Sequence, residues 1–271
     1  MFVAPSCSRS LATHLVTATP KRVIHENRRS TVAEIVVDGE HFARKTYRPR
    51  LPLPRPFPSP ARHTWKLLLR GQAEGLPFPE PVAFADAKWG GRATVITRWF
   101  SGDHLHLTHA RARAELTDSA AQRDFAKAIG EGLVTLFRAG LRTSDLAPQN
   151  LLVAGGAGSP WRVCLVDLDD AQLGRTVRGE QIIESLAQLG HLPATISARE
   201  RLLGLHCFLQ AGGEELLADW LEKNSVVALR ETLAERIGAL TVAKQKRLEA
   251  RGAADHPYAG FGLDAEGNPV R

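Results

Sequence analysis

The chain has 271 residues, 44% of them hydrophobic, which is enough to build the core of one large domain or of two smaller ones. No apolar run approaches the roughly 18 residues that cross a bilayer, and the three cysteines have neither metal-site nor disulfide spacing, which argues against membrane-spanning and disulfide-scaffold proteins. The net charge of +6 and an isoelectric point near 9.5 favour anionic partners, among them nucleotide phosphates and acidic lipid head groups.

The first 20 residues show no clear hydrophobic period, so we expect a flexible leader there. This start lacks the basic segment and continuous apolar segment of a signal peptide. Together with an odd number of scattered thiols, this indicates a protein that stays in a reducing compartment, the cytoplasm.

Three apolar runs after the leader predict the first strands of a sheet, at residues 22–24, 31–37 and 42–47. Asp38 and Gly39 form a strong hairpin turn between the second and third strands. Within the third strand, Lys45 shares a face with Ala43 and Tyr47, which predicts an inward lysine that requires an anionic partner. A lysine that protects an exposed edge strand is the alternative interpretation.

Helices are predicted from the spacing of apolar residues farther along the chain. The first covers residues 61–73, and the strands 82–84 and 94–97 follow it. The second half is mainly helical, with a helix at 123–139 that ends at Gly140. Ser197 and Glu200 form a capping box, and further helices are expected at 214–221 and 226–250.

One segment carries the chemistry, and it runs from residue 140 to residue 170. Asp145 precedes Asn150, which opens a short apolar strand at 151–153, and Asp167 closes a second strand at 163–166. A turn at 154–159 makes these two strands a hairpin, which would bring the two carboxylates and the amide together. Oxygen ligands of this kind bind hard cations, and with a base for an alcohol they make a phosphoryl-transfer site.

This segment resembles the catalytic loop and magnesium-binding aspartate of the protein-kinase-like fold, in particular those of the lipopolysaccharide kinase (Kdo/WaaP) family of Gram-negative bacteria. Two further blocks support the resemblance. Residues 42–48, with the sequence Phe-Ala-Arg-Lys-Thr-Tyr-Arg, are similar to the strand that carries the ATP-contacting lysine. Residues 75–82, Gly-Leu-Pro-Phe-Pro-Glu-Pro-Val, are similar to the proline-rich segment after the first helix of that family.

The resemblance implies an α+β, two-lobed kinase-like fold with a small β-rich N-lobe at 21–100, a mainly helical C-lobe at 101–252 and a flexible tail at 253–271. It also implies a kinase that uses ATP and Mg²⁺ to phosphorylate a sugar hydroxyl, in Kdo or heptose of the lipopolysaccharide inner core. Asp145 would position or deprotonate the acceptor, Asn150 and Asp167 would hold magnesium, and Lys45 would bind phosphate. No nucleic-acid partner is expected.

The sequence departs from the family pattern at two places. The family's first helix supplies a glutamate that pairs with the strand lysine, and alignment on Gly75 puts Thr64 at that position. The turn at 26–30 also lacks the glycine-rich loop that protein kinases have there. Another acid could replace the glutamate, catalysis could be slow, or the chain could be a degenerate kinase that serves as a nucleotide-binding regulatory module.

Two other kinds of kinase share part of this pattern. A small-molecule phosphotransferase of the aminoglycoside or choline type has the same Asp and Asn spacing. A protein kinase is less favoured, because Thr143 and Ser144 replace the usual His-Arg and only a short loop, 171–179, follows Asp170.

The end of the last helix is basic and could contact an anionic membrane, which would make the enzyme peripheral on the inner membrane, although a solvated helix face is the alternative. The cations are Lys244, Lys246, Arg247 and Arg251.

Overall fold

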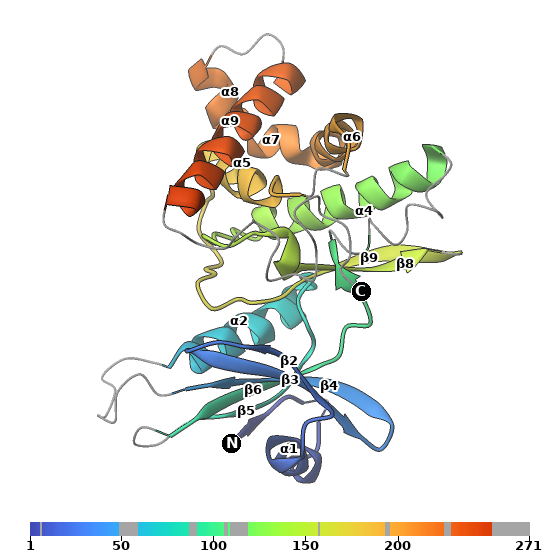
Figure 1. The fold of residues 1–271 in the computed structure, drawn as a ribbon, viewed down its shortest axis with the longest axis vertical. Coiled ribbons are helices and arrows are strands. Elements are labelled where there is room, and N and C mark those ends of the chain that lie inside the picture. Colours follow the sequence, from blue (N-terminus) through green and yellow to red (C-terminus); the bar gives the residue numbers. More distant parts are fainter. Residues whose placement is uncertain are drawn as a thin grey trace. The chain divides into compact units, whose positions relative to one another are not determined.

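The computed structural model in Figure 1 describes residues 1–5, 7–48, 59–86, 91–105, 108, 119–156, 158–192, 196–224 and 229–250. The chain divides into two compact units. Unit 1 comprises Met1–Phe100 together with Asp167–Asp169, and unit 2 comprises Ser101–Val166 and Asp170–Arg271. The predicted tail at 253–271 lies outside the described residues.

Unit 1 is built on a six-stranded antiparallel sheet with the order β1-β5-β6-β4-β3-β2. The strands are β1 (Phe2–Val3), β2 (Arg22–Glu26), β3 (Ser30–Val37), β4 (Glu40–Tyr47), β5 (Pro81–Ala85) and β6 (Ala93–Arg98). Asp38 and Gly39 both adopt positive φ angles, 52° and 79°, between β3 and β4. This is the tight hairpin turn that the sequence predicted.

Helix α2 (Pro60–Glu74) packs on β5 and β6 of this sheet, where Trp65 stacks on Phe84. Ser59 caps its first turn through a hydrogen bond from the amide of Arg62. The helix ends at Gly75, which adopts the left-handed conformation that glycine tolerates best. The predicted helix therefore forms, and it buries Thr64.

The first residues form β1 and helix α1 (Arg9–Thr17), so the expected flexible leader is wrong in this region. β1 pairs with β5, and the side chains of Ala12 and Leu15 are fully buried against core residues of the sheet such as Phe42. Figure 1 shows α1 on the face of the sheet opposite α2. Ser8 caps α1, and the apolar side chains of one helix face supply the stabilising burial.

Unit 2 begins with a three-stranded sheet, β7 (Asp103–His104), β8 (Leu151–Gly156) and β9 (Ser159–Leu165), that packs on α4 (Ser119–Arg138). Gly132 permits this close packing, because a Cβ there would lie 2.2 Å from a methyl carbon of Val163. β8 and β9 form the hairpin expected after the catalytic loop, with longer strands than predicted.

The remaining described elements of unit 2 are helices. It contains α5 (Gly179–Leu189), α6 (Ala198–Phe208), a π-helical turn η2 (Leu209–Gly213), α7 (Glu214–Leu216), α8 (Ala218–Asn224) and α9 (Leu229–Ala250). α6 packs on α4, and α9 packs on α5. The predicted capping box of Ser197 and Glu200 opens α6. Within the part of the chain that the structure describes, no helix is long and apolar enough to cross a membrane.

Candidate active site

The loop that carries Asp145 begins at Gly140, two residues after the end of α4. Gly140 has a φ of 78°, and a Cβ there would lie 2.4 Å from the carbonyl oxygen of Arg175, so a side chain is excluded by both conformation and space. Farther on, the side chain of Leu146 is fully buried, and its amide donates to Oε1 of Gln188 on α5. The loop is thus tied to the helical core on both sides of Asp145.

Asp145 and Asn150 lie in direct contact. The amide nitrogen of Asn150 donates to the main-chain oxygen of Asp145 and to its carboxylate Oδ2, each at 2.9 Å. Asn150 is buried, in the short 3₁₀ turn η1 (Pro148–Asn150), whereas Asp145 is exposed. Because both donations use the amide nitrogen, the Asn150 oxygen is turned to the other side, where it can serve as an oxygen ligand.

Asp170 holds the start of the same loop, a role that the sequence did not indicate. Thr143 donates its hydroxyl to Oδ1 of Asp170, and Ser144 donates its amide, at 2.7 Å, and its hydroxyl to Oδ2. Burial opposes the ionisation of Asp170, but these hydrogen bonds outweigh burial and lower its pKa. The two hydroxyl side chains of Thr143 and Ser144, which replace the His-Arg of protein kinases, are the donors that Asp170 requires.

Lys45 points inward from the middle of β4, where Val32 and Val95 are its neighbours on the flanking strands. Its ammonium lies 2.6 Å from Oδ1 of Asp167 and 2.8 Å from Oδ1 of Asp169. Its side chain is only 16% exposed, so a partner of opposite charge is required. The predicted inward lysine with an anionic partner is confirmed.

Asp167 follows Val166, whose amide donates to the carbonyl oxygen of Asn150 at 2.8 Å. Asp167 itself has a φ of 58°, a left-handed conformation that few residues other than glycine adopt. Backbone conformations of this kind often mark functional sites, and here it occurs at the predicted metal ligand. The carboxylate is 45% exposed and is therefore accessible to a ligand.

The two predicted metal ligands both carry oxygen atoms, and one lies in each unit. Mg²⁺ prefers oxygen ligands and is commonly held by one or two carboxylates, with phosphates and waters completing its shell. In unit 1 Asp167 offers an exposed carboxylate, and in unit 2 Asn150 offers an amide oxygen, and each is a ligand type that Mg²⁺ accepts. The described residues contain no cluster of three or more His, Cys, Asp or Glu side chains that could hold a metal without a phosphate.

The histidines near the loop have ordinary partners where the structure describes them. Nδ1 of His104 lies 2.5 Å from the carbonyl oxygen of Gln149, and burial lowers the pKa of this ring. His106 and His109 lie outside the described residues.

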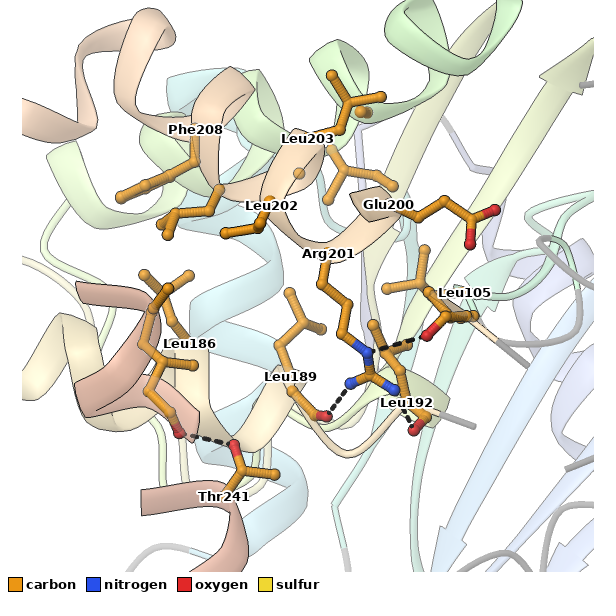
Figure 2. Close-up of a pocket in the computed structure, with 18 of the residues that line it drawn as sticks. Leu105, Leu186, Leu189, Leu192, Glu200, Arg201, Leu202, Leu203, Phe208 and Thr241 are labelled. Atoms are coloured by element: carbon orange, nitrogen blue, oxygen red, sulfur yellow. Dashed lines mark hydrogen bonds between the residues drawn. The ribbon is translucent and has the colours of Figure 1, made fainter. Parts of the chain in front are cut away.

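Unit 2 also contains an apolar cavity of about 370 Å³ between α4, α5, α6 and α9 (Figure 2). Its polar groups are already engaged: Arg201 donates to the carbonyl oxygens of Gly190, Leu192 and Ile196, and the Thr241 hydroxyl donates to that of Ala187. The cavity therefore offers mainly apolar contacts. Its lining includes Leu105, Phe125, Leu133, Leu186, Leu189 and Phe208.

Comparison with known proteins places these features in context. Over residues 19–201 the chain matches the model of the lipopolysaccharide kinase (Kdo/WaaP) family. It is also similar to a solved structure of WaaP in complex with acyl carrier protein, with a TM-score of 0.58 and 17% sequence identity over 84% of this chain and 92% of that chain. No curated protein matches the chain. The likeness to WaaP confirms the predicted kinase-like fold.

Proposed function

The chain belongs to the lipopolysaccharide kinase (Kdo/WaaP) family and is a kinase of a sugar in the lipopolysaccharide inner core, and we propose that it transfers the γ-phosphoryl group of ATP to a hydroxyl of Kdo or heptose. The observation that carries this proposal is the Asp145 carboxylate. It is exposed, and a hydrogen bond from the buried Asn150 to Oδ2 restricts its orientation, while a second from the same amide holds the main-chain oxygen of Asp145.

In this proposal Asp145 accepts the proton of the acceptor hydroxyl, or orients that hydroxyl for attack. The transition state of phosphoryl transfer is loose, so positioning supplies more of the rate than proton removal does. A carboxylate whose direction is set by Asn150 meets this requirement.

In this proposal Lys45 would contact the phosphates of ATP, and Asp167 and Asn150 would hold magnesium. Magnesium would supply positive charge that offsets the charge of the phosphates. Lys45 is already within 2.6 Å of Asp167, so the phosphate contact and the metal ligand are neighbours within unit 1. We place the reaction in the cytoplasm, where ATP is available.

The direct test is to incubate the protein with Mg²⁺, ATP and deacylated lipopolysaccharide core, and to locate any new phosphate on the core by mass spectrometry. Phosphate on Kdo or heptose supports the proposal. Phosphate on an aminoglycoside or on choline, with none on the core, would instead make the chain a small-molecule phosphotransferase. ATP binding without turnover on any acceptor would favour a regulatory module.

We further propose that this chain binds an acyl carrier protein and that the carried acyl chain enters the apolar cavity of unit 2. The solved WaaP structure holds an acyl carrier protein, which motivates the choice of partner. The volume of about 370 Å³ is in the range of ligand sites. At the cavity, the exposed side chains of Leu202 and Val242 offer further apolar contact to an entering chain.

Two glycines that line this cavity support the proposal that it binds a ligand. Gly204 in α6 and Gly238 in α9 both line it, and a Cβ at either position would meet no atom within 4 Å. Glycine inside a helix is unfavourable by roughly 1 kcal/mol relative to alanine, and no close packing requires these two. The open space beside both glycines agrees with a cavity that binds an acyl chain.

Filling the cavity tests this second proposal. Gly204→Leu and Gly238→Leu should abolish the preference for palmitoyl-carrier protein over the unacylated carrier in calorimetry, while the melting temperature stays equal or rises. Ala239→Leu, on the exposed side of α9 and outside the lining, is the matched control and should bind as wild type does. Equal binding of acylated and unacylated carrier by the wild type would refute the role of the cavity.

A further inference from the structure

Lys45 needs a carboxylate that remains with it when ATP is bound. Its side chain is 16% exposed, and an ammonium in such a place is stabilised by a paired charge. In the family pattern a glutamate on the first helix supplies that charge, but here the position is occupied by Thr64. A hydroxyl cannot neutralise an ammonium, and Asp167 is the expected magnesium ligand. The chain therefore lacks a dedicated partner for Lys45 at the usual place.

The structure brings Asp169 to Thr64 instead. Oδ1 of Asp169 accepts hydrogen bonds from the Tyr47 hydroxyl at 2.6 Å and from the Thr64 hydroxyl at 3.2 Å, and it lies 2.8 Å from the Lys45 ammonium. Tyr47 and Thr64 are buried, and their hydroxyls are 3.2 Å apart. One carboxylate oxygen of Asp169 is thus bound by Tyr47, on the strand that carries Lys45, and by Thr64, at the helix position where the family has its glutamate.

Two features direct Asp169 to this place. Leu168, between the two aspartates, is only 2% exposed, and this buried anchor leaves Asp167 and Asp169 both facing Lys45. Burial, reinforced by the negative charge of Asp169, raises the pKa of the Tyr47 hydroxyl. Tyr47 therefore stays protonated and remains a hydrogen-bond donor over the working pH range.

We propose that Asp169 is a positioning residue that replaces the helix glutamate of the family: with Tyr47 and Thr64 as its supports, it holds Lys45 toward the phosphates of ATP. This rests on the proposed function, because it concerns how the lysine is presented to the nucleotide. The two aspartates then have different roles, because Asp167 can bind the metal while Asp169 stays paired with Lys45. Thr64 then completes the lysine site, so its presence does not signal a degenerate kinase.

A carboxylate swap tests this inference through the binding of Mg²⁺–ATP, which requires no acceptor. Asp169→Asn keeps the shape of the side chain and its capacity to accept hydrogen bonds from Tyr47 and Thr64, but it removes the charge. A charge-assisted hydrogen bond is worth roughly ten- to hundred-fold in a binding constant. We expect Asp169→Asn to weaken ATP binding by about that factor with little change in melting temperature.

The second variant restores the charge from the family's own position. In the double variant Thr64→Glu with Asp169→Asn, the helix glutamate can pair with Lys45, so ATP affinity should return to within about threefold of wild type. Thr64→Val and Tyr47→Phe remove one support each and should weaken binding less than Asp169→Asn does. Lys45→Met should remain weak in both the wild-type and the Thr64→Glu backgrounds.

Three results would overturn the proposal, and each is distinct. Unchanged ATP affinity in Asp169→Asn would show that the residue does not position the lysine. Failure of Thr64→Glu to restore affinity, with a raised magnesium requirement in Asp169→Asn, would make Asp169 a metal ligand. A wild-type chain that binds no Mg²⁺–ATP would overturn the proposed function, and this inference with it.

Discussion

The amide nitrogen of Asn150 donates to both the main-chain oxygen and the carboxylate of Asp145, and this contact is the centre of the candidate active site. It links a buried residue, which cannot move freely, to an exposed one that can meet an acceptor. The same amide presents its oxygen away from Asp145. A single side chain can therefore set the direction of the base and offer a ligand to magnesium.

Replacing Asn150 by aspartate tests whether its contact with Asp145 matters for the reaction rather than for folding. Asn150→Asp keeps the size of the side chain but loses both donations and places a second carboxylate beside Asp145. We expect kcat to fall by roughly 10²- to 10⁴-fold, the range usually attributed to a positioned acid or base. ATP turnover with lipopolysaccharide core measures this, and melting temperature serves as the folding control. Activity within twofold of wild type would show that the contact has no role in the reaction.

The glycines of unit 2 allow a paired stability prediction. Gly140→Ala should lower the free energy of unfolding by about 1–3 kcal/mol, because its φ of 78° and the carbonyl of Arg175 exclude a Cβ. Gly238→Ala should raise it by roughly 1 kcal/mol, because a Cβ there meets open space within a helix. Chemical denaturation of both variants gives the two values, and shifts of the same sign would contradict the structural argument.

The lowered pKa of Glu34 predicts how the free energy of unfolding changes at acidic pH. Burial opposes ionisation of this residue, but hydrogen bonds with His41, Lys21 and Arg22 outweigh burial and lower its pKa from 4.5 to about 2. A carboxylate with a lowered folded-state pKa stabilises the fold above its unfolded pKa, and this stabilisation is lost as the pH falls toward the folded value.

The free energy of unfolding should therefore decline between pH 4.5 and 2 more steeply in the wild type than in Glu34→Gln. Denaturation midpoints measured across this pH window would show the difference. Parallel profiles for the two proteins would indicate that Glu34 does not contribute through its charge.

We expect the basic end of α9 to associate weakly with anionic vesicles. Salt should suppress this association, because exposed charges are screened within about 10 Å at 0.1 M salt. Lys246 is exposed, whereas Lys244 is half-buried, and burial lowers the pKa of Lys244 against the opposing charge of Asp145. Lys246→Glu should reduce co-sedimentation with anionic vesicles. The side chain of Arg247 and all of Arg251 lie outside the described residues. Binding that salt does not change, or no binding, would count against this membrane contact.

Local patterns predicted much of the fold, and they led to Asp145 and Asn150 as candidate site residues, which the structure places in contact. The alternation around Lys45 gave its inward direction. The predicted turn at Asp38 and Gly39 correctly indicated that β3 pairs with β4. In each case the neighbours that determine the geometry lie close in sequence, or follow directly from a strand or a hairpin.

The features that the sequence did not predict depend on long-range packing. Asp169 meets Thr64 across 105 positions of the chain, so no local period relates the two. α1 was missed for another reason: it is short, and its apolar face is defined only by its burial against Phe42 and other core residues of the sheet. The Ser8 cap followed by Leu11 and Leu15 was the available signal.

The most direct test of the central claim is ATP consumption with magnesium by the wild type beside Asp145→Ala and Asp167→Ala, each with and without deacylated lipopolysaccharide core. We expect core to stimulate turnover by the wild type, and both variants to lose this stimulated turnover. Core-stimulated turnover that persists in Asp145→Ala or in Asp167→Ala would show that these carboxylates do not carry the reaction.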